Sequence, residues 1–145
     1  MKRLLDNLNR EVANLGVLYT KLHNYHWFVN GVKFYELHEK FEELYDEVTE
    51  HFDAVAERIL MLEGTPYATL KEFLENATIK EASGKIDGKQ MVVEVLKDFT
   101  LLQEELNETI GIAQELGDEV TVDLLIGMLT SLQKHSWMFR AYLKQ

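Results

Sequence analysis

Apolar side chains recur at alternating steps of three and four residues along most of the chain, and this period limits the fold more than any other feature of the sequence. Such a period gives a helix one apolar face, which must be buried against other helices. The four apolar stripes cover residues 5–26, 34–62, 92–106 and 122–143. The sequence therefore predicts an all-α protein.

Turn-forming residues separate the stripes. Asn30-Gly31 lies between the first two, and Gly117-Asp118 between the last two combines a residue that ends helices with one that starts them. A short turn within each of these pairs requires its two helices to run antiparallel. The predicted long helices cover residues 3–29, 33–63, 89–116 and 119–143.

The connection between the second and third long helices, residues 64–88, is much longer than the other two. Within it, Thr69 and Glu72 have the spacing of a capping box, which predicts a short helix over residues 69–75. One long crossover is typical of the ferritin-like four-helix bundle rather than of the simple up-down-up-down bundle. We expect one such domain over residues 1–145.

Composition and charge exclude several classes of protein. The chain has no cysteine, so it can form neither a disulfide scaffold nor a thiolate metal site. We expect no signal peptide, no membrane span and a cytoplasmic location. The formal net charge of −10 argues against a general binder of nucleic-acid backbones, although a local basic patch remains open. The same charge is compatible with cation capture.

Four metal-ligating side chains share one face of the second predicted helix: His38, Glu42, Asp53 and Glu57. The outer two are separated by roughly 28 Å at 1.5 Å of rise per residue, so one copy of the helix cannot bring both ends of the set to one ion. Two antiparallel copies can. Positions 38 and 57 are equally distant from the centre near residues 47 and 48, and so are positions 42 and 53. A two-fold axis at this centre would face each histidine with a carboxylate of the mate.

The first helix can supply a further ligand. If the turn centres near residues 31 and 32, His26 lies opposite His38 of the same chain. Two imidazoles from one chain and two carboxylates from the other, with Glu42 nearby, suit iron, manganese or zinc. Two simpler interpretations stay open, because His26 also continues an apolar stripe and an acidic helix face is often only solvated.

Three segments together resemble the signature of the Dps family, the mini-ferritins. They are His23–Gly31 (HNYHWFVNG), Leu37–Glu39 (LHE) and Asp53–Arg58 (DAVAER), and Lys134–Phe139 (KHSWMF) extends the match. The resemblance implies a hollow homo-dodecamer of four-helix subunits with ferroxidase centres at its two-fold interfaces. It also implies oxidation of Fe(II) by hydrogen peroxide, in preference to dioxygen, and storage of a ferric mineral in the cavity.

The same resemblance assigns roles to individual residues. His26 and His38 would bind iron together with Asp53 and Glu57 of the neighbouring chain. Glu42 stands where the family commonly has Asp, so its role as a direct ligand stays open. One or two irons could occupy each centre, and zinc could substitute for iron.

Other residues receive weaker predictions. Trp27 would lie beside the centre, either passing electrons or only packing an interface. Glu119 and Asp123 match acidic positions that line three-fold pores in the family, while Gln114 stands at a further position that is acidic there. Arg58 would pair with a carboxylate. The remaining histidines and a further acidic face of the second helix are predicted to be structural or surface residues, with some of the acids open to the cavity: His23, His51 and His135, and Glu36, Glu39, Glu43, Glu47 and Glu50.

Two alternative functions remain. A non-enzymatic, nucleoid-binding assembly of the same fold would need basic tails, but only Lys2 and Arg3 precede the first helix, so we expect no significant DNA binding. A conventional ferritin would hold its iron within one bundle through Glu-x-x-His motifs. No glutamate here is followed by a histidine three residues later.

Overall fold

The four predicted stripes form four long helices in the computed structural model, which describes residues 1–144; Gln145, the last residue of the predicted domain, lies outside the described residues. These residues form five helices and no strand. The helices are α1 (Lys2–Phe28), α2 (Phe34–Met61), α3 (Leu70–Asn76), α4 (Gly88–Glu115) and α5 (Glu119–Leu143). Every helix end lies within two residues of its predicted position, so the all-α prediction is confirmed.

Local capping residues fix several of these ends. The side chains of Thr69, Asp87 and Asp118 each accept a hydrogen bond from a backbone N–H in the first turn of α3, α4 and α5. Gly117 ends α4 with a φ of +71°, a left-handed conformation in which a side chain would be strained. The boundary between α4 and α5 is therefore set by the Gly117-Asp118 pair.

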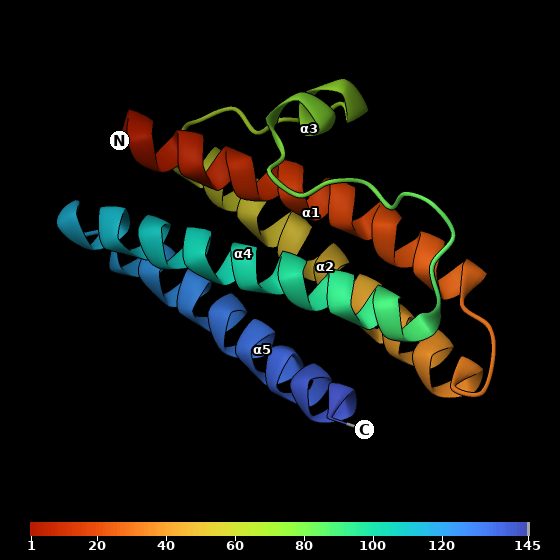
Figure 1. Cartoon of the computed structure of the whole chain (residues 1–145). Helices are drawn as coiled ribbons and strands as arrows, with labels where there is room; N and C mark the ends of the chain where they lie inside the picture. Colours follow the sequence, from red (N-terminus) through yellow and green to blue (C-terminus); the bar gives the residue numbers. More distant parts are fainter. Residues whose placement is uncertain (145) are drawn as a thin grey trace.

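The helices form two antiparallel pairs, α1 with α2 and α4 with α5 (Figure 1). The crossover between α2 and α4 passes along α1 for most of the length of the bundle and carries α3 on its outer side (Figure 1). Because of this long return, α2 and α4 run in the same direction. This is the ferritin-like arrangement that the long connection predicted.

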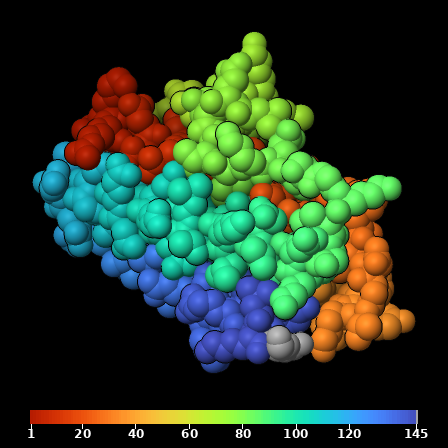
Figure 2. All heavy atoms as spheres, viewed as in Figure 1, coloured from red at the N-terminus to blue at the C-terminus, as the bar shows by residue number. Residues whose placement is uncertain are grey.

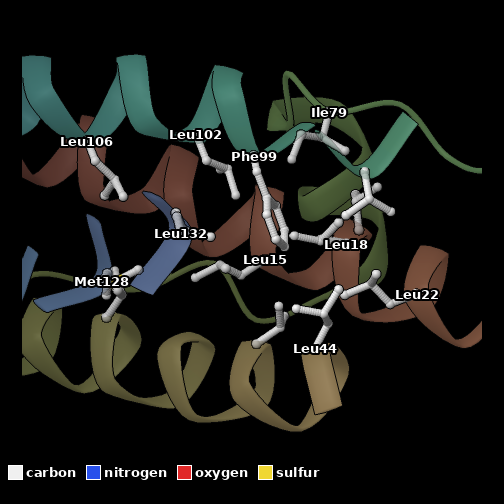
Figure 3. Packing of buried hydrophobic residues seen from close by; sticks show 14 of the residues in the cluster. Leu15, Leu18, Leu22, Leu44, Ile79, Phe99, Leu102, Leu106, Met128 and Leu132 are labelled. Carbon is white, nitrogen blue, oxygen red and sulfur yellow. The ribbon is translucent and has the colours of Figure 1, made fainter. Parts of the chain in front are cut away.

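One connected group of buried apolar side chains fills the space between the helices. Figure 3 shows side chains from all four long helices and from the crossover meeting in this core, among them Leu15, Leu18, Leu22, Leu44, Ile79, Phe99, Leu102, Leu106, Met128 and Leu132. Burying each large apolar side chain stabilises the fold by roughly 1.5–3 kcal/mol. The core therefore fixes which helix faces remain free for other contacts.

Polar side chains of α1 hold the crossover, which has little regular structure of its own. Asn9 binds the carbonyl of Thr65 and the N–H of Tyr67, and Lys21 donates to the carbonyl of Lys80. Figure 2 shows the crossover lying as a continuous layer against α1 and α4 on this face. Within residues 1–144, no helix is long and apolar enough to span a bilayer.

Candidate metal centre

Two histidines face each other where α1 ends and α2 begins. The rings of His26 and His38 stack with their centroids 3.7 Å apart and their planes 14° apart. The Nδ1 atom of His26 lies 2.7 Å from the carbonyl oxygen of His38, and Nδ1 of His38 lies 2.7 Å from the carbonyl oxygen of His26. The short turn at Gly31, where φ is +96°, allows this close approach of the two helices.

These reciprocal hydrogen bonds determine where each imidazole carries its proton. A carbonyl oxygen can only accept a hydrogen bond, so each Nδ1 must be the protonated nitrogen that donates. In the neutral rings, both Nε2 atoms then keep a free lone pair, which is the form that binds a metal ion. Nε2 of His26 lies 3.8 Å from Oε1 of Glu42, which is beyond hydrogen-bond length.

Two carboxylates lie one turn apart toward the other end of α2. Asp53 and Glu57 are both exposed. A hydrogen bond with Asp53 and the charge of that residue raise the pKa of Glu57. The two side chains therefore lie close together and point into solvent, a geometry in which a cation between them would be favourable.

The two groups of ligand-type residues are separate within one chain. His26 of α1 lies beside His38 and Glu42 at the start of α2, whereas Asp53 and Glu57 lie about four and five turns further along α2 from His38. Across the described part of the chain, no three His, Cys, Asp or Glu side chains are grouped closely enough to hold one ion. Within one chain, each group therefore offers too few donors to hold an ion alone.

Aromatic rings connect Trp27 with the histidine pair. Trp27 is 66% exposed, and its ring lies 5.4 Å from that of His23. His23 stacks on Tyr45 at 3.7 Å, and Tyr45 meets His26 edge-on at 5.3 Å. Tyr45 was not predicted to contact the histidines, although its position seven residues after His38 places it on the same face of α2.

Comparison with known proteins agrees with this arrangement. A family model for the ferritin-like domain matches residues 5–145. The chain is 50% identical over 142 residues to "General stress protein 20U" of Bacillus subtilis (strain 168), covering 98% of each chain, and 49% identical over 144 residues to "DNA protection during starvation protein 2" of Bacillus anthracis, covering 99% of each. The crystal structure of Dps from Staphylococcus aureus matches with a TM-score of 0.97 and 48% identity, over 99% of this chain and 96% of that one.

The chain belongs to the Dps family. Its resemblance to that family, based on three short segments of the sequence, is therefore confirmed over nearly its whole length. The matched Dps structure also confirms the ferritin-like fold.

One residue of this Dps chain differs from its predicted role. The sequence places Glu47 on an acidic face that is solvated or open to the cavity. In the structure, its side chain instead forms hydrogen bonds between α2 and α5. Its carboxylate accepts hydrogen bonds from Ser131 Oγ at 2.7 Å and His135 Nε2 at 3.1 Å, and His51 Nε2 lies 3.4 Å away. The four other acids of that face are exposed: Glu36, Glu39, Glu43 and Glu50.

A second contact between α2 and α5 involves Arg58. Its guanidinium lies 2.9 Å from Oδ1 of Asp118 and donates to the hydroxyl of Thr121 at 2.9 Å. Arg58 thus pairs with a carboxylate, as expected, and that carboxylate caps α5. Glu119 and Asp123, in the first two turns of α5, remain exposed.

The environment of Glu47 predicts a pH-dependent contribution to stability. Burial alone would raise the pKa of Glu47, but hydrogen bonds from His135 and Ser131 and the nearby imidazole of His51 outweigh burial and lower that pKa below its usual range. We expect Glu47→Gln to reduce the free energy of unfolding at pH 7 by about 1–3 kcal/mol, because the charged acceptor is lost. Urea unfolding at a fixed protein concentration measures this difference.

Acid should remove the difference. Because the pKa is lower in the folded state, the stabilisation is present above the unfolded pKa of about 4.3 and disappears as the pH falls through the folded value. Glu50→Gln, an exposed substitution on the same helix, should behave like the unchanged protein. A Glu47→Gln curve that coincides with that control at pH 7 would contradict this role.

Proposed function

We propose that this protein is a ferroxidase and iron-storage shell, in which Fe(II) is oxidised at centres shared by two chains and the ferric product is stored in the cavity of a homo-dodecamer. The observation that supports this most directly is the division of the ligand set. One chain presents two imidazoles with free Nε2 atoms at one end of α2 and two exposed carboxylates toward the other. Neither group completes a site alone.

A two-fold axis across α2 near residues 47 and 48 would unite the two groups. Because an isologous dimer repeats each contact, one such dimer would contain two equivalent centres, each with His26 and His38 from one chain and Asp53 and Glu57 from the other. The large exposed rings of Trp27 and Phe28, 66% and 65% exposed beside His26, support burial of this end of α1 in an interface.

The ligand chemistry supports oxidation of bound Fe(II). Carboxylate oxygens are hard anionic donors, which stabilise Fe(III) more than Fe(II) and so favour loss of an electron. Two Fe(II) ions supply the two electrons that reduce one hydrogen peroxide, with two protons, to two waters. Dioxygen is the alternative oxidant. Zinc suits the same donors but has no accessible redox step, so bound zinc would compete with iron.

Four further residues have proposed roles at this centre or in the entry of Fe(II). Glu42, which faces His26, is the candidate for an additional ligand from the histidine side. Trp27 contacts His23, which packs on Tyr45, and this places an oxidisable ring near the centre. We propose that Glu119 and Asp123, both exposed, line the pore through which Fe(II) reaches the cavity. A ring of such carboxylates would concentrate cations at its mouth.

The alternative function is a non-enzymatic assembly that binds the nucleoid. Some matched relatives carry the name "DNA protection during starvation protein". In this chain the formal charge of −10 opposes contact with phosphates. We propose that protection here comes from removing Fe(II) and peroxide together in the cytoplasm, without DNA binding.

Removing a ligand from either side of the centre should abolish rapid oxidation. We expect His26→Ala and Asp53→Ala each to lower the rate of peroxide-driven Fe(II) oxidation by about tenfold or more, since loss of even outer-shell partners costs 10–100-fold at metal sites. Anaerobic loading with Fe(II), followed by peroxide addition and detection of ferric absorbance, measures the rate.

A matched control separates ligand loss from general damage. Glu50→Ala removes an exposed carboxylate of α2 that lies outside the proposed ligand set. It should retain the original rate and assembly state. Unchanged rates in His26→Ala and Asp53→Ala assemblies would rule out this centre.

The charge of the protein predicts its behaviour toward DNA. The intact assembly should cause no mobility shift of duplex DNA at neutral pH and physiological salt, because acidic subunits repel phosphates. A gel-shift titration that extends to low ionic strength, where any electrostatic binding is strongest, tests this. Tight binding by the intact oligomer would favour the nucleoid-binding alternative instead.

A further inference from the structure

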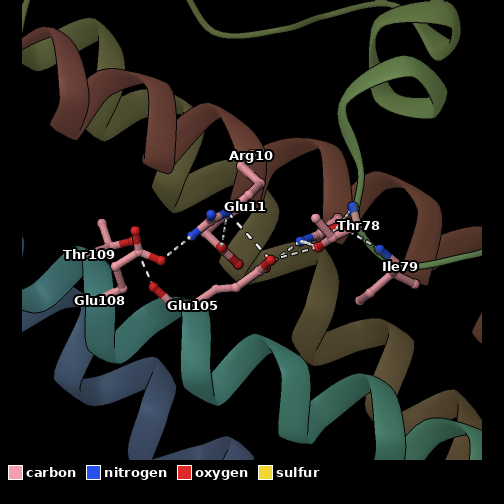
Figure 4. Close-up of polar contacts among 8 residues, drawn as sticks. Arg10, Glu11, Thr78, Ile79, Glu105, Glu108 and Thr109 are labelled. Carbon is pink, nitrogen blue, oxygen red and sulfur yellow. Dashed lines mark hydrogen bonds and ion pairs between the residues drawn. The ribbon is translucent and has the colours of Figure 1, made fainter.

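A buried cluster of charged side chains lies between α1, α4 and the crossover, outside the proposed metal centre (Figure 4). Glu11 of α1 is 1% exposed and Glu105 of α4 is 7% exposed. Nε of Arg10 lies 3.5 Å from a carboxyl oxygen of each. One guanidinium thus contacts two carboxyl groups that face each other in the interior.

The charges of this cluster do not balance when both glutamates are ionised. Arg10 supplies one positive charge, and part of it is directed to Glu108, whose carboxylate lies 3.5 Å away at the surface. The groups that the crossover and the rest of α1 contribute are neutral. Burying an unpaired carboxylate is costly, and the usual relief is uptake of a proton. One proton on the pair leaves a single negative charge opposite Arg10.

We propose that Glu11 holds a proton at neutral pH, and that this proton keeps the crossover segment Thr78–Ile79 attached to α1 and α4. Oε1 of Glu11 is buried and has no hydrogen-bond partner among the described residues, whereas both oxygens of Glu105 accept hydrogen bonds.

The electrostatics agree with this geometry. Burial raises the pKa of Glu11 well above its usual range, and the charge of Glu105 and a hydrogen bond with it raise that pKa further, while Arg10 opposes the shift. Glu105 is the acidic group of α4 that acts on Glu11, and Arg10 is the basic group of its own helix. Asn14 and Thr78, which complete the cluster, do not titrate.

Glu105 connects the proton to the crossover. Its carboxylate accepts hydrogen bonds from Asn14 Nδ2 at 2.8 Å and from Thr78 Oγ at 2.7 Å. The side-chain oxygen of Asn14 in turn accepts from the backbone N–H groups of Thr78 at 2.8 Å and Ile79 at 3.0 Å. The position of Glu105 therefore orients Asn14, and Asn14 holds two consecutive amides of the crossover.

Loss of the proton should open this attachment before it opens the helices. Deprotonation would place the negative charge of Glu11 beside Glu105. Entry of water at the segment Thr78–Ile79 would relieve this repulsion at the lowest free-energy cost. Thr78 is exposed and belongs to the non-helical stretch between α3 and α4, whereas Glu11 and Glu105 are held in long helices. Because the pKa of Glu11 is higher in the folded state, the attachment is strongest in mild acid and weakens as the pH rises through that folded value.

Infrared spectroscopy of the intact assembly tests for the proton. The difference spectrum between the unchanged protein and Glu11→Gln at pH 7 should contain the C=O stretch of one protonated carboxyl group per chain. Glu108→Gln removes the third carboxylate near Arg10, and the corresponding difference spectrum should contain only bands of an ionised carboxylate.

Hydrogen exchange tests the attachment. In the unchanged assembly, protection of the Thr78 and Ile79 amides, corrected for the intrinsic base-catalysed rate, should fall by up to about tenfold for each pH unit above the pKa of Glu11. In Glu11→Gln it should stay constant, because the neutral amide replaces the protonated acid. Glu108→Gln should keep the original pH dependence. The capped Gln90 amide of α4 serves as an internal reference.

Either of two results overturns the proposal: absence of the protonated carboxyl band, or the same pH dependence of exchange at residues 78 and 79 with and without Glu11. If Glu11→Gln does not assemble, Glu11→Met gives the same test, because it also removes the titrating carboxyl group and keeps the hydrogen bonds of Glu105 with Asn14 and Thr78. These measurements need no iron, so their outcome is independent of the proposed ferroxidase function.

Discussion

A helix is a rigid rod, and the length of α2 is the constraint on which the proposed chemistry depends. The helix separates His38 from Glu57 by nineteen residues, roughly 28 Å, and no motion short of breaking it brings them together. The reciprocal hydrogen bonds between His26 and His38 then prepare one end of the rod as a nitrogen donor pair. The other end presents carboxylates to solvent. The proposed ferroxidase function therefore requires self-association, and the fold leaves both ends of this face of α2 accessible for it.

The crossover also depends on groups from another part of the structure. It must return the chain along the whole bundle so that α4 runs parallel to α2, yet it contains only one short helix (Figure 1). Side chains of α1 supply the hydrogen-bond partners that it lacks. As a result, α1 carries an apolar face for the core, polar groups for the crossover and, in its last turn, a histidine of the proposed metal centre. The buried Glu11 of α1 and Glu105 of α4 lie beside the polar groups that hold the crossover.

Local features of the sequence predicted most of the fold because local chemistry determines them. Helix periods, the Gly117-Asp118 pair and the cap at Thr69 act over a few residues, so helix ends were predicted to within two residues. The juxtaposition of His26 with His38 follows from one short turn. Glu47, Tyr45 and the Glu11–Glu105 pair depend instead on which residues of distant helices meet them. Glu105 and Glu47 contact residues of the crossover, α1 and α5 that are 27 to 95 positions away in the sequence. The partners of Tyr45 lie on α1, across the turn. Helical period alone does not identify such contacts.

Mixed assemblies test the shared centre most directly. A His26→Ala chain and an Asp53→Ala chain are each inactive alone if every centre needs both residues, one from each partner. Unfolded and reassembled together in equal amounts, they should recover about one quarter of the original rate of Fe(II) oxidation by peroxide, because random pairing leaves that share of centres with an intact histidine side and an intact carboxylate side. A mixture no more active than either variant alone would contradict a centre that spans two chains.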